Sequence, residues 1–464
     1  MTVAADFVPN SAARGVRSPV LCSGGIKRSR RLRTDVQRDV SARKASPILH
    51  RSKTAGWLME TTRGSGDRAV DERRVGTYAA AALALQIIAV VVWVFRYYRL
   101  HDRSAPMVGS DFAVFWAAAR VALEHGPTAI FSPQWIQPIE AALRPSGEFA
   151  PWPYPPTFLL VVIPFGLVSF ARAIVVFGVL SIACYAAVVA CLARPLDAQR
   201  RLAIAAFPGL IGAALTMQNA FLTVAAAGAA LLLLRSRPIV AGACIALLTM
   251  KPQYGVLFPL ALICGRHWKA LVSAGMFSVA FVAASAAAFG ADAWRAFIAF
   301  LPTFNRGVVE YGETFWRGMP SLFAMVRAAG APLPLAYGVH ASVAVMAVAA
   351  LAYVWIRGAR FELRAAALAA ATLLVQPYYM YYDLLWLVLP VVFLLLDCRN
   401  VGPDRLDIAV IALAWITPAQ AFIAVITGTM WPVASVILVA VLVVIVRRAA
   451  GSMPAGVGCA AASR

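Results

Sequence analysis

The stretch Thr77–Tyr98, TYAAAALALQIIAVVVWVFRYY, decides the fold, because it is apolar over a length that crosses a membrane. A spanning helix needs about 20 predominantly apolar residues to cross roughly 30 Å of hydrocarbon. Similar runs recur as far as Val446, and 61% of the 464 residues are hydrophobic, whereas a soluble domain is about 45–50% apolar. Because lipid offers the backbone no hydrogen-bond partners, the spans must be helices. The sequence therefore predicts an all-α, polytopic membrane bundle.

The net charge of +21 indicates orientation rather than a nucleic-acid partner. Much of the positive charge precedes Thr77, and the rest lies in short loops between apolar runs. Short loops rich in Lys and Arg stay in the cytoplasm. An RNA-binding tail is the alternative explanation of the first basic segment. The basic loops are Arg194–Arg201, Arg235–Arg237, Arg266–Lys269, Arg357–Arg364, Cys398–Arg405 and Arg447-Arg448.

Placing these loops inside predicts about twelve transmembrane helices with both termini in the cytoplasm. After Thr77–Tyr98, the expected crossings are 172–193, 202–217, 219–234, 238–250, 254–265, 268–289, 335–356, 365–377, 384–397, 406–427 and 431–446. Two further apolar pieces, Thr157–Phe170 and Met319–Gly330, are shorter than a span requires. We expect both to be re-entrant or interfacial helices on the outer face.

The two ends of the chain are predicted to be cytoplasmic tails around a transmembrane domain at 77–446. Residues 1–76 contain no apolar run and are rich in Arg, Ser and Gly, which predicts a disordered basic tail. They are not a signal peptide, because no apolar region follows the basic residues within the usual length of such a peptide. Met59 precedes a short polar lead into the first span, so we expect translation to start there and residues 1–58 not to be translated. Residues 447–464 form the other tail.

Metal and nucleotide chemistry lack sequence support. The seven cysteines form no CxxC pair and are interpreted as small hydrophobic residues. Phosphate-binding loops of the GxxxxGK[ST] type, HExxH and GxSxG are absent. There is no room for a cytoplasmic nucleotide-binding domain. If the protein is a transferase, its donor is therefore expected to be carried in the lipid.

Asp111 is the first acidic residue of interest, because it opens the aromatic-rich stretch Ser110-Asp111-Phe112-Ala113-Val114-Phe115-Trp116 soon after the first span. It satisfies the requirements of a helix cap, where a carboxylate favours the free N–H groups and the helix dipole. The alternative is a general base at the membrane surface. Phe112, Phe115 and Trp116 recur at helical spacing, which predicts a helix lying on lipid.

The predicted topology places five polar motifs on the same outer face, which suggests a shared site. They are Ser110-Asp111, Tyr154-Pro155-Pro156, Met217-Gln218-Asn219, Lys251-Pro252-Gln253 and Tyr381-Tyr382-Asp383. Each motif also has a structural explanation. Tyr154 belongs to a stiff turn, Gln218 and Asn219 suit hydrogen bonds between helices, and Tyr382 suits an interfacial belt. In the functional interpretation, Tyr154, Gln218, Asn219, Tyr382 and Asp383 bind the sugar or its acceptor.

Three cations are candidates for binding a phosphate group. Lys251 lies between two apolar runs, where a charge is either functional or extends to the interface. Arg306 and Arg317 lie in a polar segment at 291–318 that also suits a solvated surface helix.

These motifs together resemble glycosyltransferase family 87, a family of membrane glycosyltransferases with the GT-C fold. The resemblance rests on Ser110-Asp111-Phe112-Ala113-Val114-Phe115-Trp116-Ala117-Ala118-Ala119, Tyr154-Pro155-Pro156, Gln218-Asn219, Lys251-Pro252 and Tyr382-Asp383-Leu384, and it extends over residues 77 to about 446. It implies an enzyme that uses a polyprenyl-phosphate sugar, for example a mannose donor, and a lipid or glycan acceptor facing the periplasm. It implies that Asp111 is the catalytic base.

The resemblance implies a multi-pass protein of the bacterial inner membrane with its active site on the periplasmic face. Some family members have a histidine near the later Tyr-Asp motif, where this chain has Tyr381 and Tyr382. No Asp-x-Asp pair lies near Asp111, so we expect no required metal or other cofactor. We expect an inverting transfer in which the cations stabilise the leaving phosphate.

Two other functions fit parts of the pattern. A lipid or solute transporter, or flippase, would use Lys251 and Asp383 as intramembrane charges, but the two halves of the chain show no convincing repeat. An O-antigen ligase or polymerase also takes lipid-linked sugars.

Overall fold

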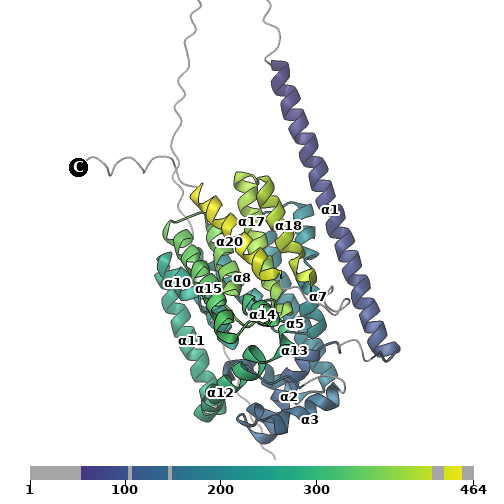
Figure 1. Ribbon diagram of the computed structural model, residues 1–464, viewed down its shortest axis with the longest axis vertical. Coiled ribbons are helices and arrows are strands. Elements are labelled where there is room, and N and C mark those ends of the chain that lie inside the picture. Colours follow the sequence, from purple (N-terminus) through teal and green to yellow (C-terminus); the bar gives the residue numbers. More distant parts are fainter. Residues whose placement is uncertain (1–53, 103–106, 145–148, 421–432, 452–464) are drawn as a thin grey trace, which may run out of the picture. The chain divides into compact units, whose positions relative to one another are not determined.

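The computed structural model describes residues 54–102, 107–144, 149–420 and 433–451, and all secondary structure in these ranges is helical. By its contacts the chain divides into Met1–Thr61 and a main unit, Thr62–Arg464. The main unit holds every helix discussed below except the first residues of α1 (Figure 1). The predicted all-helical architecture is confirmed for the described residues.

Within the described ranges, five helical segments of 21 to 27 residues are long and apolar enough to cross a membrane, so the protein is an integral membrane protein. They are Arg73–Arg99 within α1 (Thr54–Arg99), α5 (Phe170–Ala193), α11 (Trp268–Phe289), α15 (Leu333–Ile356) and Tyr381–Val401, which joins the 3₁₀ helix η6 (Tyr381–Leu387) to α17 (Val388–Val401). Their exposed apolar side chains need lipid as solvent.

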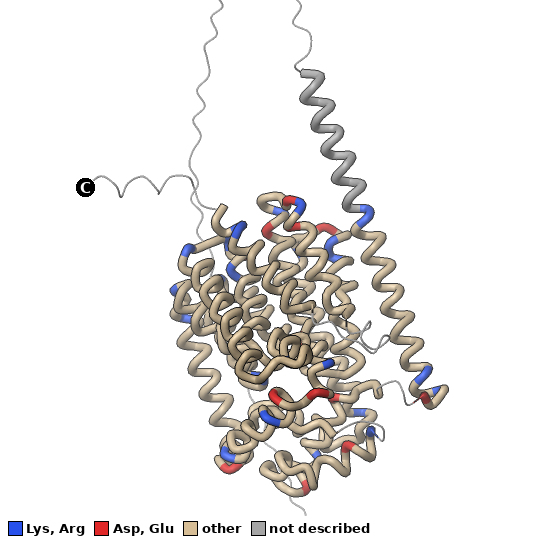
Figure 2. The backbone as a smooth tube through the Cα atoms, in the orientation of Figure 1, with Lys and Arg blue, Asp and Glu red and all other residues tan. Residues whose placement is uncertain are grey.

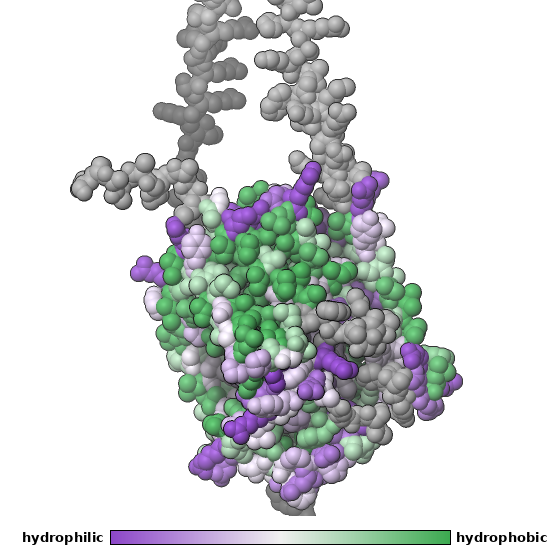
Figure 3. Space-filling view, in the orientation of Figure 1, coloured by the Kyte–Doolittle hydropathy of each residue, from purple (hydrophilic) through white to green (hydrophobic). Residues whose placement is uncertain are grey.

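Charge and hydropathy are segregated along these helices. Figure 2 shows the charged residues of the main unit gathered toward helix ends, with long uncharged stretches between them. Figure 3 shows apolar side chains over much of the same face, with hydrophilic ones at its upper rim and in its lower part. This pattern matches a hydrocarbon layer bounded by two polar regions.

The remaining predicted crossings are shorter or interrupted helices. Predicted span 202–217 divides into α6 (Ala198–Ala205) and α7 (Gly209–Thr216), because Pro208 cannot donate the backbone hydrogen bond that would continue the helix. The other short apolar helices are α8 (Ala220–Leu233), α9 (Pro238–Ala246) with η3 (Leu247–Met250), η4 (Pro252–Tyr254) with α10 (Phe258–Cys264), and α16 (Phe361–Leu374). The count of about twelve crossings therefore stays a prediction.

The two pieces expected to be interfacial form short helices. The first contains α4 (Pro156–Val162) and the 3₁₀ helix η2 (Ile163–Leu167), and the second contains α14 (Leu322–Ala328). Between them lie α12 (Ala291–Phe304), the π-helix η5 (Asn305–Glu310) and α13 (Glu313–Trp316). None of these helices is long enough to cross roughly 30 Å alone.

The end of α17 remote from Asp383 is held by a network of buried ion pairs. Asp397 accepts from Arg360 at 2.6 Å and from Arg448 at 2.6 Å. Asp407 contacts Arg447 and Arg448. Both aspartates are at most 1% exposed. The network joins α16, α17, α18 (Arg405–Ile416) and α20 (Ala434–Ala450). Helix α16 packs against α17 and α20, and α17, α18 and α20 lie next to one another in Figure 1.

The predicted tails lie mostly outside the described residues, which exclude 1–53 and 452–464. Helix α1 begins at Thr54, upstream of the predicted boundary at residue 76, and α20 continues past residue 446 to Ala450. The predicted crossings near 406–427 and 431–446 also overlap residues 421–432, which are not described.

Candidate active site

Asp111 is placed by a tight backbone turn at the start of α2 (Ser110–His125). Gly109 precedes the helix with φ of 80°, and its N–H donates to the carbonyl of Leu215 at 2.6 Å. An added Cβ at Gly109 would lie 2.1 Å from Cδ1 of Ile174. A residue with a side chain would be strained here on both counts. Glycine therefore lets the first turn of α2 approach the neighbouring helices closely.

The aromatic residues of α2 pack inside the protein, so the prediction that Phe112 and Phe115 lie on lipid is wrong. Phe112 is 0% and Phe115 is 1% exposed. Phe115 makes edge contacts with Phe158 and Phe177, at centroid distances of 5.0 and 6.0 Å. Helices α4 and α5 cover the face that was assigned to lipid, because a helical apolar stripe specifies burial but not the partner that buries it.

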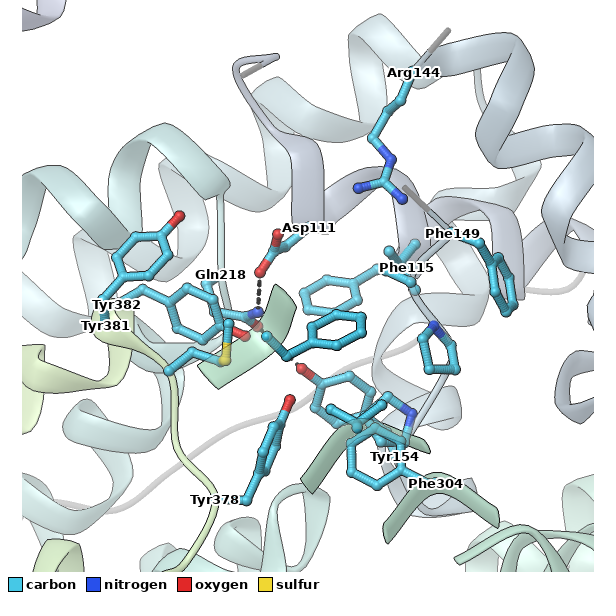
Figure 4. A pocket seen from close by; sticks show the side chains of 17 residues that line it. Asp111, Phe115, Arg144, Phe149, Tyr154, Gln218, Phe304, Tyr378, Tyr381 and Tyr382 are labelled. Atoms are coloured by element: carbon cyan, nitrogen blue, oxygen red, sulfur yellow. Dashed lines mark hydrogen bonds between the residues drawn. The ribbon is translucent and has the colours of Figure 1, made fainter. Parts of the chain in front are cut away.

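The Asp111 carboxylate is oriented by its neighbour Ser110 and by Gln218 from a distant part of the chain; Figure 4 shows the contact with Gln218. Nε2 of Gln218 donates to Oδ2 of Asp111 at 2.7 Å, and Oγ of Ser110 donates to Oδ1 at 3.2 Å. The Gln218 amide is oriented in turn, because its Oε1 accepts from the Asn219 N–H at 2.8 Å and from the Tyr154 hydroxyl at 3.3 Å. These two donors require oxygen at that position and therefore direct the NH₂ group toward Asp111.

Asp111 lines a cavity of about 330 Å³. The other lining residues are mainly aromatic or apolar. They come from α2, the chain after α3, the turn between α7 and α8, the segment from the end of α12 to α13, and η6 with the loop before it. They are Val114, Phe115, Arg144, Phe149, Ala150, Pro151, Pro153, Tyr154, Gln218, Phe304, Val308, Phe315, Tyr378, Met380, Tyr381 and Tyr382. This volume accepts a sugar ring, since small-molecule sites typically measure about 300–1,000 Å³.

The cavity raises the pKa of Asp111. Desolvation by burial is the largest cause, and it is opposed by the hydrogen bond from Gln218 and by the positive charge of Arg144. Hydrogen bonds from Ser110 and Tyr382 also lower the pKa, but the net direction is upward. A carboxylate of raised pKa is a stronger base than an ordinary aspartate, provided that it is ionised.

Arg144 is a site residue that the sequence analysis missed. It follows the last turn of α3 (Pro133–Leu143), and its Nη2 donates to Oε2 of Glu140 at 2.7 Å. In sequence, the pair resembles an ordinary i,i+4 surface pair of a helix, so no local signal distinguished it. Figure 4 shows the guanidinium extending into the same cavity as Asp111.

Lys251 and Asp383 form a buried ion pair beside the cavity, and neither side chain lines it. Nζ of Lys251 lies 2.7 Å from Oδ1 of Asp383, and the two side chains are 4% and 1% exposed. The ammonium also lies over the rings of Tyr254 and Tyr382, 5.1 and 5.5 Å from their centroids. Oδ2 of Asp383 accepts the Met380 N–H at 3.1 Å, which caps η6.

The close packing of α7 positions the Tyr381-Tyr382-Asp383 segment. A Cβ at Gly209 would lie 3.0 Å from the Cα of Leu385, and one at Gly212 would lie 3.4 Å from the Tyr381 ring. Small residues on α7 therefore let η6 approach closely. The Tyr381 N–H donates to the Gly318 carbonyl at 2.9 Å, which joins η6 to the end of α13.

The other predicted site residues divide into buried and exposed positions. Asn219 is 0% exposed and does not line the cavity. Arg306 and Arg317 are exposed and do not line it either. Their assignment to the donor phosphate, like that of Lys251, stays a prediction. In the described ranges, no group of three His, Cys, Asp or Glu residues is arranged to hold a metal ion.

Comparison with known proteins adds one finding to this geometry. Residues 152–377 match the model of glycosyltransferase family 87. The match includes Tyr154, Gln218 and Lys251, whereas Asp111 precedes it and Asp383 follows it. No curated protein and no solved structure matches the chain.

Proposed function

Because the chain belongs to glycosyltransferase family 87, we propose that it moves a hexose, such as mannose, from a polyprenyl-phosphate donor to a lipid or glycan acceptor. The family establishes that the protein is a glycosyltransferase, and its spans establish that it is a membrane protein. The identities of donor, sugar and acceptor, and the mechanism below, are the proposal.

The observation that carries the proposal is the Asp111 carboxylate in an aromatic-lined cavity. Gln218 holds one carboxylate oxygen through a bond of 2.7 Å, and burial raises the pKa of the group. In the proposed reaction, Asp111 takes the proton of an acceptor hydroxyl. The acceptor oxygen then bonds to the anomeric carbon, while the bond from that carbon to the phosphate oxygen breaks. The electron pair leaves with the polyprenyl phosphate, and the displacement inverts the anomeric configuration.

The tyrosines of the cavity support a sugar substrate. Tyr154, Tyr378 and Tyr382 all line the cavity with Asp111. Aromatic rings pack against the apolar faces of sugars, and their hydroxyls offer hydrogen bonds. Burial raises the pKa of Tyr154 and of Tyr378, so both stay protonated and able to donate. We assign the sugar to the space between these rings and Asp111.

We propose that the cavity opens to the periplasmic side of a bacterial inner membrane, within a topology of about twelve crossings and cytoplasmic termini. The support is the positive-inside pattern of the loops. Arg360, Arg447 and Arg448 lie at the ends of their helices near Asp397, which is separated from the Asp383 end by the length of α17.

Replacing Asp111 with asparagine tests the mechanism. The variant keeps the shape of the side chain and an acceptor for Gln218 but cannot take a proton. We expect transfer from radiolabelled polyprenyl-phosphate mannose to fall on the order of 10²–10⁴-fold, the usual contribution of a general base. The purified variant should elute as the wild type does on size exclusion.

The matched control is Asp292→Asn, at an exposed aspartate of α12 whose partner Arg295 is exposed as well. It should transfer sugar at the wild-type rate. Undiminished turnover in Asp111→Asn would exclude Asp111 as the base. Transfer with retention of the anomeric configuration would exclude a single displacement.

A further inference from the structure

Within the part of the chain that the structure describes, the cavity of the proposed active site is lined by two charged side chains of opposite sign, Asp111 and Arg144. Figure 4 shows them approaching it from separate helices, Asp111 at the start of α2 and Arg144 after α3. They interact electrostatically, since the positive charge of Arg144 lowers the pKa of Asp111. A carboxylate and a guanidinium in one cavity provide a base and an anion-binding group.

The guanidinium is held by a buried carboxylate. Glu140 is 2% exposed, and its Oε2 accepts from Arg144 at 2.7 Å and from the Ala150 N–H at 3.1 Å. A charge at this depth is stable only when it is paired. The pair therefore orders the end of α3 and presents a planar cation to the cavity. A guanidinium is a planar cation whose N–H groups only donate hydrogen bonds, which suits it to an anion.

The other cations considered for the donor lie elsewhere. Lys251 is engaged with Asp383 in a buried pair outside the cavity lining. Arg306 and Arg317 are exposed and are not lining residues. Among the described residues, Arg144 is thus the cation of the cavity lining, and guanidinium groups match phosphate oxygens in geometry and charge.

We propose that Arg144 binds the phosphate group of the prenyl-phosphate donor, an inference that rests on the proposed function. The sugar then lies between the two charges. When the bond between the anomeric carbon and the phosphate oxygen breaks, its electron pair becomes negative charge on that oxygen, and Arg144 stabilises it. The proton of the acceptor hydroxyl goes to Asp111. Asp111 thus takes up the proton, and Arg144 faces the negative charge that forms on the phosphate.

Binding of farnesyl phosphate to the purified full-length protein, measured by calorimetry in detergent, tests the assignment. Farnesol, which has the same chain without the phosphate, reports binding of the chain alone, and inorganic phosphate reports binding of the anion alone. We expect Arg144→Gln to weaken farnesyl phosphate on the order of 10–100-fold and to leave farnesol unchanged. Arg144→Lys should fall between, because it keeps the charge and loses the planar fork. Inorganic phosphate should compete weakly at the same site.

Matched controls are Arg306→Gln and Arg317→Gln, which should bind farnesyl phosphate as the wild type does. Equal affinity in Arg144→Gln and the wild type, or a loss confined to either control, would overturn the assignment. Because Arg144→Gln leaves Glu140 buried without its cation, the double variant Glu140→Gln/Arg144→Gln provides a second measurement with no unpaired carboxylate.

The same experiment distinguishes a failure of the Arg144 assignment from a failure of the proposed function. Asp111→Asn should bind farnesyl phosphate at least as tightly as the wild type while losing transfer. Wild-type protein that transfers sugar and binds farnesyl phosphate, with Arg144→Gln unaffected, would reject the role of Arg144 alone. Wild-type protein that binds no prenyl phosphate would reject the donor class and this inference together.

Discussion

At the residue scale, the chemistry of Asp111 depends on two opposing effects on one carboxyl. Burial raises its pKa, whereas Gln218, Arg144, Ser110 and Tyr382 lower it. A base must be ionised to act, yet it gains strength as its pKa rises. The hydrogen bond from Gln218 favours the ionised form of the carboxylate and fixes its orientation. Gln218 therefore acts through Asp111, in addition to any contact with the sugar.

This balance predicts the pH dependence of transfer. Because the pKa of Asp111 is raised, kcat/KM should be full above that pKa and fall as the pH drops through it. Gln218→Met removes a hydrogen bond that lowers the pKa, so the acidic limb of the profile should move to higher pH. Tyr154→Phe should move it less, because the Asn219 N–H still orients the Gln218 amide.

The measurement is a pH–rate profile of the wild type and both variants. Tyr185→Phe is the matched control, since the buried Tyr185 hydroxyl lies in a different core cluster and has no hydrogen-bond partner among the described residues. It should reproduce the wild-type profile. An acidic limb that stays in place in Gln218→Met would show that Gln218 does not act on the base.

At the element scale, the start of α2 and the start of η6 bring the two halves of the site together. Gly109 begins α2 at a positive φ and against Ile174. Asp383 caps η6 and pairs with Lys251 at the end of η3. The first junction depends on the absence of a side chain at Gly109, and the second on the Asp383 carboxylate, which caps η6 and pairs with Lys251. Even a small change of side chain at either junction should therefore cause a large loss of activity or stability.

Gly109→Ala should reduce transfer strongly, because its Cβ would displace Ile174 or move Asp111. Gly126→Ala at the other end of α2 is the matched control, since Gly126 also has positive φ, 90°, but an added Cβ there meets nothing within 4 Å. Backbone strain of this kind costs about 1–3 kcal/mol. Both variants should lose thermal stability, whereas Gly109→Ala alone should lose most of its kcat. Equal kcat values in the two variants would contradict the packing argument.

The Lys251–Asp383 pair predicts an asymmetry between single and double substitutions. Asp383→Leu leaves a buried ammonium unpaired and should destabilise the protein by about 3–5 kcal/mol. Lys251→Met/Asp383→Leu removes both charges and should recover most of that stability. Thermal denaturation in detergent measures the difference. If the double variant is as unstable as the single one, the unpaired ammonium is not the cause of the lost stability.

At the scale of the whole molecule, the two ends of one candidate span carry different groups of charged residues. Asp383 and Asp397 lie near opposite ends of the segment Tyr381–Val401, which is a candidate span. The first belongs to the surroundings of the cavity, and the second to the arginine-rich network that joins α16, α17, α18 and α20. The site and the basic network are therefore separated by the thickness of the helical bundle.

This separation predicts labelling from opposite sides of the membrane. In a cysteine-free background, Glu124→Cys on α2 should react with a membrane-impermeant maleimide added to the periplasmic side. Arg357→Cys, in the basic loop after α15, should react only after the membrane is permeabilised. Both positions are exposed. Labelling of both from one side would contradict the proposed topology.

The sequence by itself determined that the chain is helical and lies in a membrane, because hydrocarbon demands long apolar segments and internally paired backbone. It also singled out Asp111, since a carboxylate stands out beside a span. Only the tertiary structure decided that Phe112 packs on protein, since apolar patterns encode burial but not the partner. The same holds for the contact of Gln218 with Asp111 across 107 residues, the pairing of Lys251 with Asp383 across 132, and the entry of Arg144 into the cavity. Such contacts depend on how helices pack, and no local pattern of residues specifies them.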